Sequence, residues 1–214
     1  MECVKLGYKF YFIFALILIT PATIVAGVIS TFVETLPTDG IIGYLSSVGF
    51  FDAPTALIIL FLLFWSFSNH LWKIKHVDTL LGIPNINGRY EGELVSSHTE
   101  DKTQNGTYPI VIEVKQTLTD IQVFLYTERS CSYSLIASMC KNYTKNFELV
   151  YVYQNKTSAM HADADMRDHH GSAFLELANG GNTLNGYYFN NPRERGRYGK
   201  IKVTRVSRKQ KGGF

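Results

Sequence analysis

The stretch that decides the fold reads APTALIILFLLFWSFSNHLW from Ala53 to Trp72, and Lys73-Ile-Lys75 follows it. His70 is its only ionisable side chain. About 20 residues of α-helix are about 30 Å long, the thickness of a bilayer's hydrocarbon core. Asp52 is placed to cap this helix, and Trp72 before two lysines is typical of an interfacial anchor. A buried core helix is the alternative, but such a helix rarely runs this long without a polar stripe. The stretch predicts a membrane-spanning helix over residues 53–72.

A second apolar run precedes this one. Residues 10–33 carry no charge. This run is long enough to span a bilayer with some tilt, and Pro21 should kink the helix that it forms. A cleaved signal peptide is the alternative, but the run is too long for one and another apolar run follows. The connector of residues 34–52 contains acidic side chains and no Lys or Arg, whereas both outer flanks carry lysines. Residues 1–75 are therefore predicted to form a two-helix transmembrane hairpin with both termini in the cytoplasm. Residues 41–51 are predicted to form a short interfacial helix.

The chain after residue 85 is rich in strands. Eight stretches have the alternation or the β-branched and aromatic content of strands, and turn residues separate them. They are residues 88–96, 108–117, 120–127, 130–139, 147–155, 171–178, 183–190 and 197–206. An even number of short antiparallel strands favours a closed up-and-down β-barrel over a sandwich, and eight strands enclose room for one small ligand. The expected fold class is membrane plus all-β, with a cytoplasmic barrel over 85–206. A basic tail over 207–214 would lie beside anionic lipids or be a solvated terminus.

The composition argues against several functions. A net charge of +3 over 214 residues does not indicate a binder of polymeric nucleic acid. Cys3, Cys131 and Cys140 form no disulfide framework; the last two could pair across a hairpin, but reduced thiols suit a cytoplasmic domain better. No GxSxG, HExxH, CxxC or P-loop motif is present, and the cluster from His161 to His170 fits no zinc or calcium spacing. We therefore expect no catalytic residue, no metal site and no cofactor.

The candidate ligand-binding residues gather at the mouth of the barrel that faces away from the hairpin. Alternation places polar side chains on inward faces near this mouth, namely Thr127, Ser132, Ser134, Tyr151, Tyr153, Asn155, Tyr188 and Asn190. The loop above them carries three alternating arginines, Arg193, Arg195 and Arg197. Tyrosine rings stack on bases and arginine forks pair with phosphates, which is what a nucleotide ligand needs. A polar barrel with a solvated basic turn explains the same pattern, and the pattern alone favours that alternative.

Six short stretches of the chain occur in the same order in a known family. They are Gly88–Gly92, Arg129–Ser134, Leu149–Asn155, His170-Gly171, Leu184–Asn190 and Arg195–Gly199. With the hairpin, they resemble the two-transmembrane β-barrel effectors of bacterial cyclic-oligonucleotide-based anti-phage signalling (CBASS) over nearly the full length. The resemblance implies an eight-stranded barrel that binds a cyclic dinucleotide made by a partner nucleotidyltransferase. It adds Tyr90 to the candidate ligand-binding residues. It also implies a multi-pass protein of the bacterial inner membrane that forms a homo-oligomer on activation and disrupts the lipid bilayer, which kills the infected cell.

The function expected from the sequence is thus a membrane-anchored receptor and effector. A membrane-tethered, lipocalin-like carrier of an apolar ligand is the alternative, although such a carrier should have an apolar lumen and no arginines at its mouth. A membrane-bound enzyme that uses His169 or His170 is a third interpretation, which nothing in the residue spacing supports.

Overall fold

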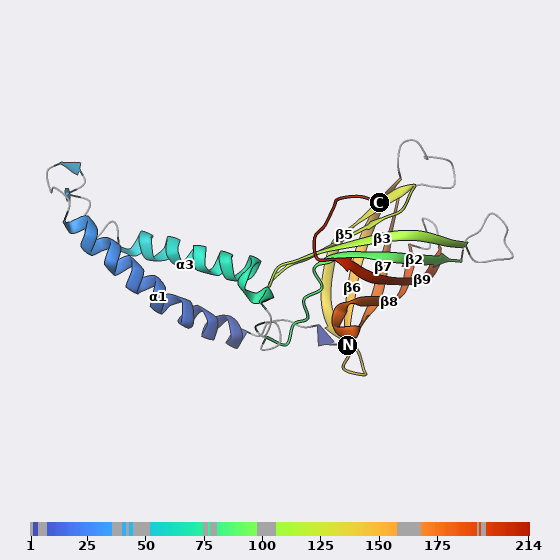
Figure 1. The fold of residues 1–214 in the computed structure, drawn as a ribbon, viewed down its shortest axis with the longest axis horizontal. Coiled ribbons are helices and arrows are strands. Elements are labelled where there is room, and N and C mark those ends of the chain that lie inside the picture. The colour runs from blue at the N-terminus through green and yellow to red at the C-terminus, as the bar shows by residue number, and fades with distance from the viewer. Residues whose placement is uncertain are drawn as a thin grey trace. The chain divides into compact units, whose positions relative to one another are not determined.

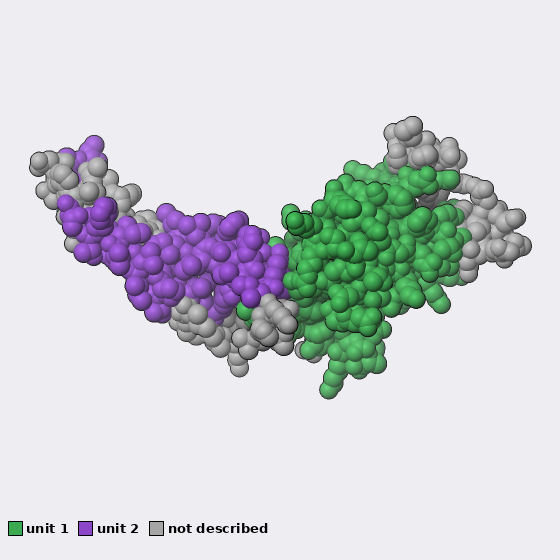
Figure 2. All heavy atoms as spheres, viewed as in Figure 1, with its two compact units in different colours: residues 1–4, 75–214 green, residues 5–74 purple. Residues whose placement is uncertain are grey.

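The computed structural model describes residues 2–3, 8–35, 40–41, 43–44, 52–74, 77, 81–97, 106–157, 168–191, 193 and 196–214. The chain divides into two units, which Figure 2 colours separately. One unit joins residues 1–4 to residues 75–214, and the other is residues 5–74. The helices belong to the shorter unit and the barrel belongs to the longer one, so each is considered by itself.

The shorter unit is a pair of helices, α1 (Tyr8–Glu34) and α3 (Asp52–Asn69), followed by the 3-10 turn η1 (Leu71–Lys73) (Figure 1). Phe14 of α1 packs against Phe67 of α3 with their ring centroids 4.3 Å apart. Helices therefore occur at both apolar runs of the sequence. They pack through rings, without an ionisable side chain at this contact.

The membrane-spanning role of these helices stays a prediction. Over the residues described, no helix combines the length and the apolar character that crossing a membrane requires. α1 continues through Pro21. The interfacial helix expected over residues 41–51 falls largely outside the described residues.

The longer unit is an antiparallel barrel. Its eight strands are β2 (Gly88–Ser96), β3 (Gly106–Gln116), β4 (Ile121–Tyr126), β5 (Ser130–Lys141), β6 (Phe147–Thr157), β7 (His169–Ala178), β8 (Thr183–Asn190) and β9 (Tyr198–Ser207). Each strand pairs with the next along the chain, and β9 pairs with β2, which closes the ring (Figure 1). The predicted eight-stranded up-and-down barrel is confirmed. Two of its strands, β2 and β8, have the predicted ends.

The structure extends several other strands beyond their predicted ends, β7 and β5 among them. β7 begins at His169, two residues earlier than expected, because His169 and His170 pair with Asn155 and Gln154 of β6. β5 continues to Lys141, where it pairs with an additional strand, β1 (Glu2–Cys3). β1 was not predicted, because two residues are too few to show the period of a strand.

The half of the lumen nearest the start of β2, called the base from here on, holds the apolar core. Its buried side chains include Ile86, Ile112, Val114, Leu149, Leu175, Leu184 and Val203. Tyr90 lies among them, fully buried, and its hydroxyl is 2.9 Å from the carbonyl oxygens of both Ile86 and Gly181. The base therefore supplies the apolar burial that stabilises the barrel, with its one tyrosine hydroxyl satisfied by backbone carbonyls.

The C-terminal tail is bound to the outside of the barrel. The backbone N–H of Lys211 donates to the Glu113 carboxylate at 2.7 Å, and that of Gly212 donates at 3.1 Å. Arg89 contacts the same carboxylate at 3.1 Å and donates to the carbonyl oxygen of Gly213 at 2.6 Å. Arg89 and Glu113 are both buried. The tail thus covers a buried ion pair, a contact that the sequence did not suggest, and its place beside anionic lipids stays a prediction.

Candidate ligand site in the barrel

The other half of the lumen is polar. Six inward side chains lie there, from three strands: Ser132 of β5, Tyr151, Tyr153 and Asn155 of β6, and Tyr188 and Asn190 of β8. All six are buried. We call this set the polar layer. The strand registers place its members side by side, since Ser132 pairs with Asn155, and both Tyr153 and Asn190 pair with Gly171 of β7. These six are residues that strand alternation predicted, so the structure brings most of the predicted site together.

Hydrogen bonds fix the orientation of the polar layer. The Ser132 hydroxyl donates to Oδ1 of Asn155 at 2.8 Å, and the Tyr153 hydroxyl donates to Oδ1 of Asn190 at 2.7 Å. The rings of Tyr151 and Tyr153 are tilted with their centroids 5.9 Å apart. Because both amide oxygens accept from neighbouring hydroxyls, the amide Nδ2 groups of Asn155 and Asn190 are donors that a ligand can use.

The Tyr151 hydroxyl stands out in this layer. It is buried and has no hydrogen-bond partner among the described residues. Burial raises the pKa of Tyr151, and it also raises the pKa values of Tyr153 and Tyr188, so all three phenols are neutral at physiological pH. A buried hydroxyl without a partner costs about 1–3 kcal/mol. This cost is offset only when another molecule forms a hydrogen bond with the Tyr151 hydroxyl.

Two residues next to the polar layer were missed by the sequence reasoning. His169 is buried, and its ring meets the Tyr153 ring edge-on at 6.5 Å. A Cβ added at Gly171 would collide with the Tyr153 ring and hydroxyl, so this glycine makes room for the tyrosine. The sequence does contain a signal for both residues. Every second residue of this strand faces inward, so the series Leu175 and Ala173 continues to Gly171 and His169. The strand predicted from the sequence begins at Gly171, so it does not include His169.

The barrel itself uses the hydroxyls of two other predicted site residues. Tyr90 is in the base, where its single hydroxyl proton has two backbone carbonyl acceptors within 2.9 Å. Ser134 sits where the register of β5 against β6 shifts, and its Oγ accepts the backbone N–H of Val123 at 2.9 Å. The register shift is a β-bulge, which redirects side chains away from simple alternation. Thr127, also expected inward, bonds through its hydroxyl within its own turn, to the N–H of Ser130 at 2.9 Å.

The structure places two of the three predicted arginines. Arg197 is half-buried, and its carbonyl oxygen accepts the N–H of Asn190 at 2.7 Å, so it adjoins the polar layer. The positive charge of Arg197 lowers the pKa of Tyr188, but burial outweighs it. Arg193 is exposed in the β8–β9 loop, where its N–H donates to Oδ1 of Asn191. Arg195 lies outside the described residues.

Within the described residues, no group of three or more His, Cys, Asp or Glu side chains is placed to hold a metal ion. Most of the acidic and histidine cluster from residue 161 to residue 170 lies outside the described part of the chain. The polar layer itself consists of neutral hydroxyls and amides, which bind a ligand through hydrogen bonds and ring stacking.

Comparison with known proteins gives two findings. A family model described as "Cap15, cyclic dinucleotide receptor domain" matches residues 81–205, which is more than half of the chain and contains seven barrel strands and all but the last two residues of β9. CD-NTase-associated protein 15 of Yersinia aleksiciae is 29% identical over 140 residues. That alignment covers 65% of this chain and 64% of the relative. The part of the chain that the family model matches is therefore the barrel, which carries the polar layer.

Proposed function

Because this chain belongs to the Cap15 family of cyclic dinucleotide receptors, a CBASS effector family, we propose that it is a membrane-anchored receptor whose polar layer binds a cyclic dinucleotide. One observation carries the assignment to this layer. The buried Tyr151 hydroxyl lacks a partner among the residues that the structure describes, while the one tyrosine hydroxyl of the base has two nearby carbonyls. The layer is thus arranged for a partner outside the barrel's own residues.

The chemistry of the layer suits this ligand class. A cyclic dinucleotide presents two bases with flat faces and polar edges, and two phosphates with one negative charge each. The tyrosines offer rings for stacking, and the amides of Asn155 and Asn190 offer hydrogen bonds to base edges. Arg197 adjoins the layer and Arg193 lies in the loop above it, where arginine forks can pair with phosphates. A carrier of apolar ligands would bury these hydroxyls and amides at a cost, so we favour the receptor. The proposal assigns binding, and no catalysis, to this layer.

We further propose that the helical unit anchors the receptor in the bacterial inner membrane as a two-helix hairpin, with the barrel and both termini in the cytoplasm. Support comes from the uncharged run of residues 10–33 and from the lysines that flank both helices but not their connector. Large apolar side chains also point outward. Val28 and Phe32 of α1 are 65% and 66% exposed, and Phe61 of α3 is 64% exposed. Water is a costly surrounding for such side chains, and lipid is not.

The response to the ligand completes the proposal. A nucleotidyltransferase makes the cyclic dinucleotide during infection, as the words "CD-NTase-associated" in the relative's name suggest for that protein. Binding makes copies of the chain assemble into a homo-oligomer, the hairpins disrupt the membrane, and the infected cell dies. The CBASS resemblance supports these steps.

Calorimetry tests the ligand assignment on the full chain in detergent micelles. The titrants are cyclic di-AMP, cyclic di-GMP, cyclic GMP–AMP and cyclic UMP–AMP. We expect at least one of them to bind. Tyr188→Ala should then weaken binding by about 5- to 150-fold, because a stacked base is worth about 1–3 kcal/mol. The matched control is Tyr187→Ala, the adjacent tyrosine, which is 52% exposed on the outer face of the same strand.

Two results would contradict the proposal. One is the absence of binding by every cyclic dinucleotide to folded wild-type chain. The other is an equal loss of affinity in Tyr188→Ala and Tyr187→Ala, since a ligand in the lumen contacts only the inward ring.

A further inference from the structure

The turn between β5 and β6 presents an aromatic ring at its tip. We call residues 142–146 the Tyr143 turn. Among the large apolar and aromatic side chains that the structure describes, Tyr143 is the most exposed, at 95%. Lys141 and Lys145 flank it and are exposed as well. An exposed tyrosine between lysines is the residue pattern of an anchor at a membrane–water interface, where the ring lies among the lipid headgroups.

Hydrogen bonds hold the backbone of this turn in one conformation. Oδ1 of Asn142 accepts the backbone N–H groups of Thr144 and Asn146, both at 3.0 Å, and the hydroxyl of Thr144 at 2.6 Å. The N–H of Asn142 donates to the carbonyl oxygen of Asn146 at 2.9 Å. Nδ2 of Asn146 also donates to Glu176 of β7 at 2.6 Å. The exposed ring therefore extends from an ordered backbone, so binding through it requires little further ordering of the chain.

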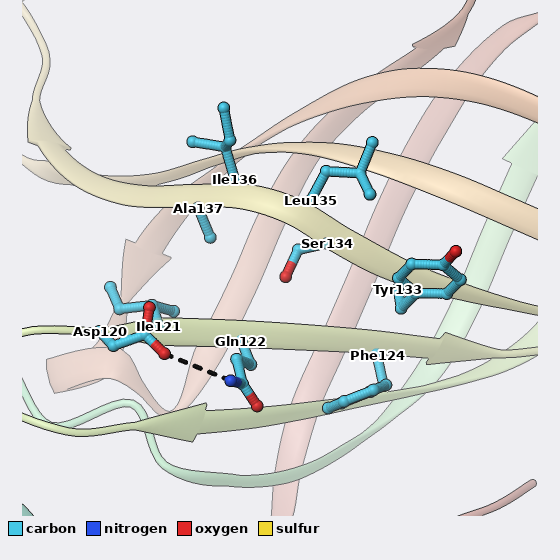
Figure 3. Close-up of a pocket in the computed structure, with 9 residues that line it drawn as sticks. All are labelled: Asp120, Ile121, Gln122, Phe124, Tyr133, Ser134, Leu135, Ile136 and Ala137. Atoms are coloured by element: carbon cyan, nitrogen blue, oxygen red, sulfur yellow. Dashed lines mark hydrogen bonds between the residues drawn. The ribbon is translucent and has the colours of Figure 1, made fainter.

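The end of the barrel that carries this turn is basic. It is the base end, where β2 begins and β9 ends. One acidic side chain, Asp120, is exposed there among those that the structure describes, and Gln122 donates a hydrogen bond to it at 3.3 Å (Figure 3). Glu148 and Glu176 are half-buried. Six basic side chains are exposed at the same end, and we call them the basic rim: Lys115, Lys141, Lys145, Arg208, Lys209 and Lys211.

The tail residues of the basic rim are held on the barrel. The N–H of Lys211 donates to the Glu113 carboxylate at 2.7 Å, and the N–H of Lys209 donates to the Ser207 hydroxyl at 3.0 Å. These bonds use backbone groups and leave the charged side chains exposed. Phe214, the last residue, is 57% exposed and adds a second aromatic ring to the tail. The charges of the tail thus belong to a structured part of the barrel, which distinguishes them from a freely solvated terminus.

The chain enters the barrel at this same end. Ile83 and Ile86 are buried, and the N–H of Ile86 donates to Oε1 of Gln116 at 2.9 Å. The residues directly before β2 are therefore bound to the base, and the helical unit precedes them in the chain. In the proposed function the helices lie in the bilayer, so the base is the end of the barrel that is tethered to it.

We propose that the Tyr143 turn and the basic rim dock the base of the barrel onto the anionic surface of the bilayer. The Tyr143 ring lies among the headgroups, and the lysines and arginines lie beside the lipid phosphates. The sign of the charge selects this partner, because the cytoplasmic leaflet carries a negative surface potential. This inference deepens the proposed function and rests on it, since the helical anchor brings the base to the membrane.

Photo-crosslinking tests this surface on the full chain in lipid nanodiscs. One set of nanodiscs contains phosphatidylcholine, and the other contains equal parts of phosphatidylcholine and the anionic phosphatidylglycerol. Tyr143 is replaced by the photo-crosslinker p-benzoylphenylalanine, and mass spectrometry measures lipid adducts after irradiation. The matched control is the same replacement at Tyr198, which is 66% exposed and begins β9 at the opposite end of the barrel. In the anionic nanodiscs, the adduct yield from position 143 should exceed that from position 198 at least about fivefold, the factor expected from one basic residue near the surface.

A charge reversal shows whether the basic rim causes the contact. Lys145→Glu, combined with the crosslinker at position 143, should lower the adduct yield in anionic nanodiscs at least about fivefold, for the same reason. Lys145 is chosen because Lys141 pairs in register with Glu2 of β1. Arg129→Glu is the control, since Arg129 is exposed in the β4–β5 turn at the opposite end, and it should leave the yield unchanged. Phosphatidylcholine nanodiscs should also give a lower yield than anionic ones.

Several results would overturn the proposal. They are equal adduct yields from positions 143 and 198, equal yields at position 143 in the two kinds of nanodisc, and a yield that Lys145→Glu leaves unchanged or that Arg129→Glu lowers as much. The comparison between the two lipid compositions needs no charge variant. It therefore keeps the proposal falsifiable if Lys145→Glu fails to fold.

Two measurements on the same samples separate this inference from the proposed function. A chain that does not stay with the nanodiscs contradicts the membrane anchor. A chain in nanodiscs that binds no cyclic dinucleotide in calorimetry contradicts the receptor. A chain that stays with the nanodiscs and binds a cyclic dinucleotide, but forms no lipid adduct at position 143, contradicts only the docking of the base.

Discussion

The two halves of the barrel lumen use tyrosine in opposite ways. In the base, Tyr90 is fully buried and its hydroxyl lies within hydrogen-bonding distance of two backbone carbonyls. In the polar layer, Tyr151 is equally buried, yet its hydroxyl has no partner among the described residues. The difference teaches that burial alone does not describe a lumen tyrosine, because two buried tyrosines differ in whether the barrel provides a partner for the hydroxyl. In the proposed function, the base serves stability and the polar layer serves recognition.

The largest expected effect is a loss of stability caused by a substitution in the base. Leu175→Ala removes a fully buried side chain that faces Leu149 in the apolar core. Large-to-small changes of this kind cost about 2–5 kcal/mol, through lost burial and the cavity left behind. Chemical denaturation should show this loss in the free energy of unfolding. Leu135→Ala, at an exposed position, is the control and should change it by less than about 0.5 kcal/mol. Ligand affinity of the folded Leu175→Ala chain should stay close to that of wild type, and a loss as large as that of Tyr188→Ala would mean that the two halves are not separate.

Alkaline pH should act on both halves. Burial raises the pKa of Tyr90 to about 12, and it raises the pKa values of Tyr151 and Tyr153 further above the usual range. Above pH 10 the unfolded chain loses these phenolic protons while the folded chain keeps them, so the free energy of unfolding falls as pH rises. Each such tyrosine contributes a slope of about 1.4 kcal/mol per pH unit. Denaturation between pH 8 and pH 11.5 measures it.

A single substitution checks that these tyrosines cause the slope. Tyr90→Phe removes one titrating group, so the slope above pH 10 should decrease by about 1.4 kcal/mol per pH unit. An unchanged slope would show that Tyr90 ionises in the folded barrel at its usual pKa.

A third change compares the two ends of the barrel by charge. Asn190→Asp keeps an oxygen that accepts from the Tyr153 hydroxyl but adds a negative charge to the polar layer, where it opposes the phosphates of the ligand. The affinity for the cyclic dinucleotide should fall at least about tenfold, which is about 1.4 kcal/mol. The same change at the exposed Asn182, in the turn at the base, is the control. Calorimetry decides between them, and equal effects would place the ligand outside the polar layer.

The fold was largely predictable because the barrel wall repeats one simple rule. Inward and outward residues alternate, and this period located β2 and β8 to the residue. What escaped prediction depends on contacts between distant backbone groups. β1 is too short to have a period, and the tail is held by N–H groups of Lys211 and Gly212, which any sequence would offer. The pattern of side chains therefore predicts neither contact.

The candidate site was predictable to the extent that alternation holds. It located all six residues of the polar layer, because each lies on a regular part of its strand. Alternation is less informative at Ser134, because the bulge beside it breaks the period, and a bulge is decided by how two strands meet. Tyr90 could not be separated from Tyr151 by sequence, since the same residue type faces the same lumen. Only the hydrogen-bond partners in the structure distinguish the two.

The smallest expected effects give the most direct comparison, because the same Tyr-to-Phe change is made in the base and in the polar layer. Tyr90→Phe removes a hydroxyl that two carbonyls use, so the free energy of unfolding should fall by about 0.5–1.5 kcal/mol while affinity for the ligand stays unchanged. Tyr151→Phe removes a hydroxyl without a partner, so the stability should stay the same or rise by about 1 kcal/mol, because the cost of the unsatisfied group disappears. The affinity should fall by about 5- to 10-fold, the worth of one hydrogen bond to the ligand. Denaturation and calorimetry on both variants at pH 7 measure the four quantities. A loss of stability without a loss of affinity in Tyr151→Phe would mean that its hydroxyl serves the barrel, as that of Tyr90 does.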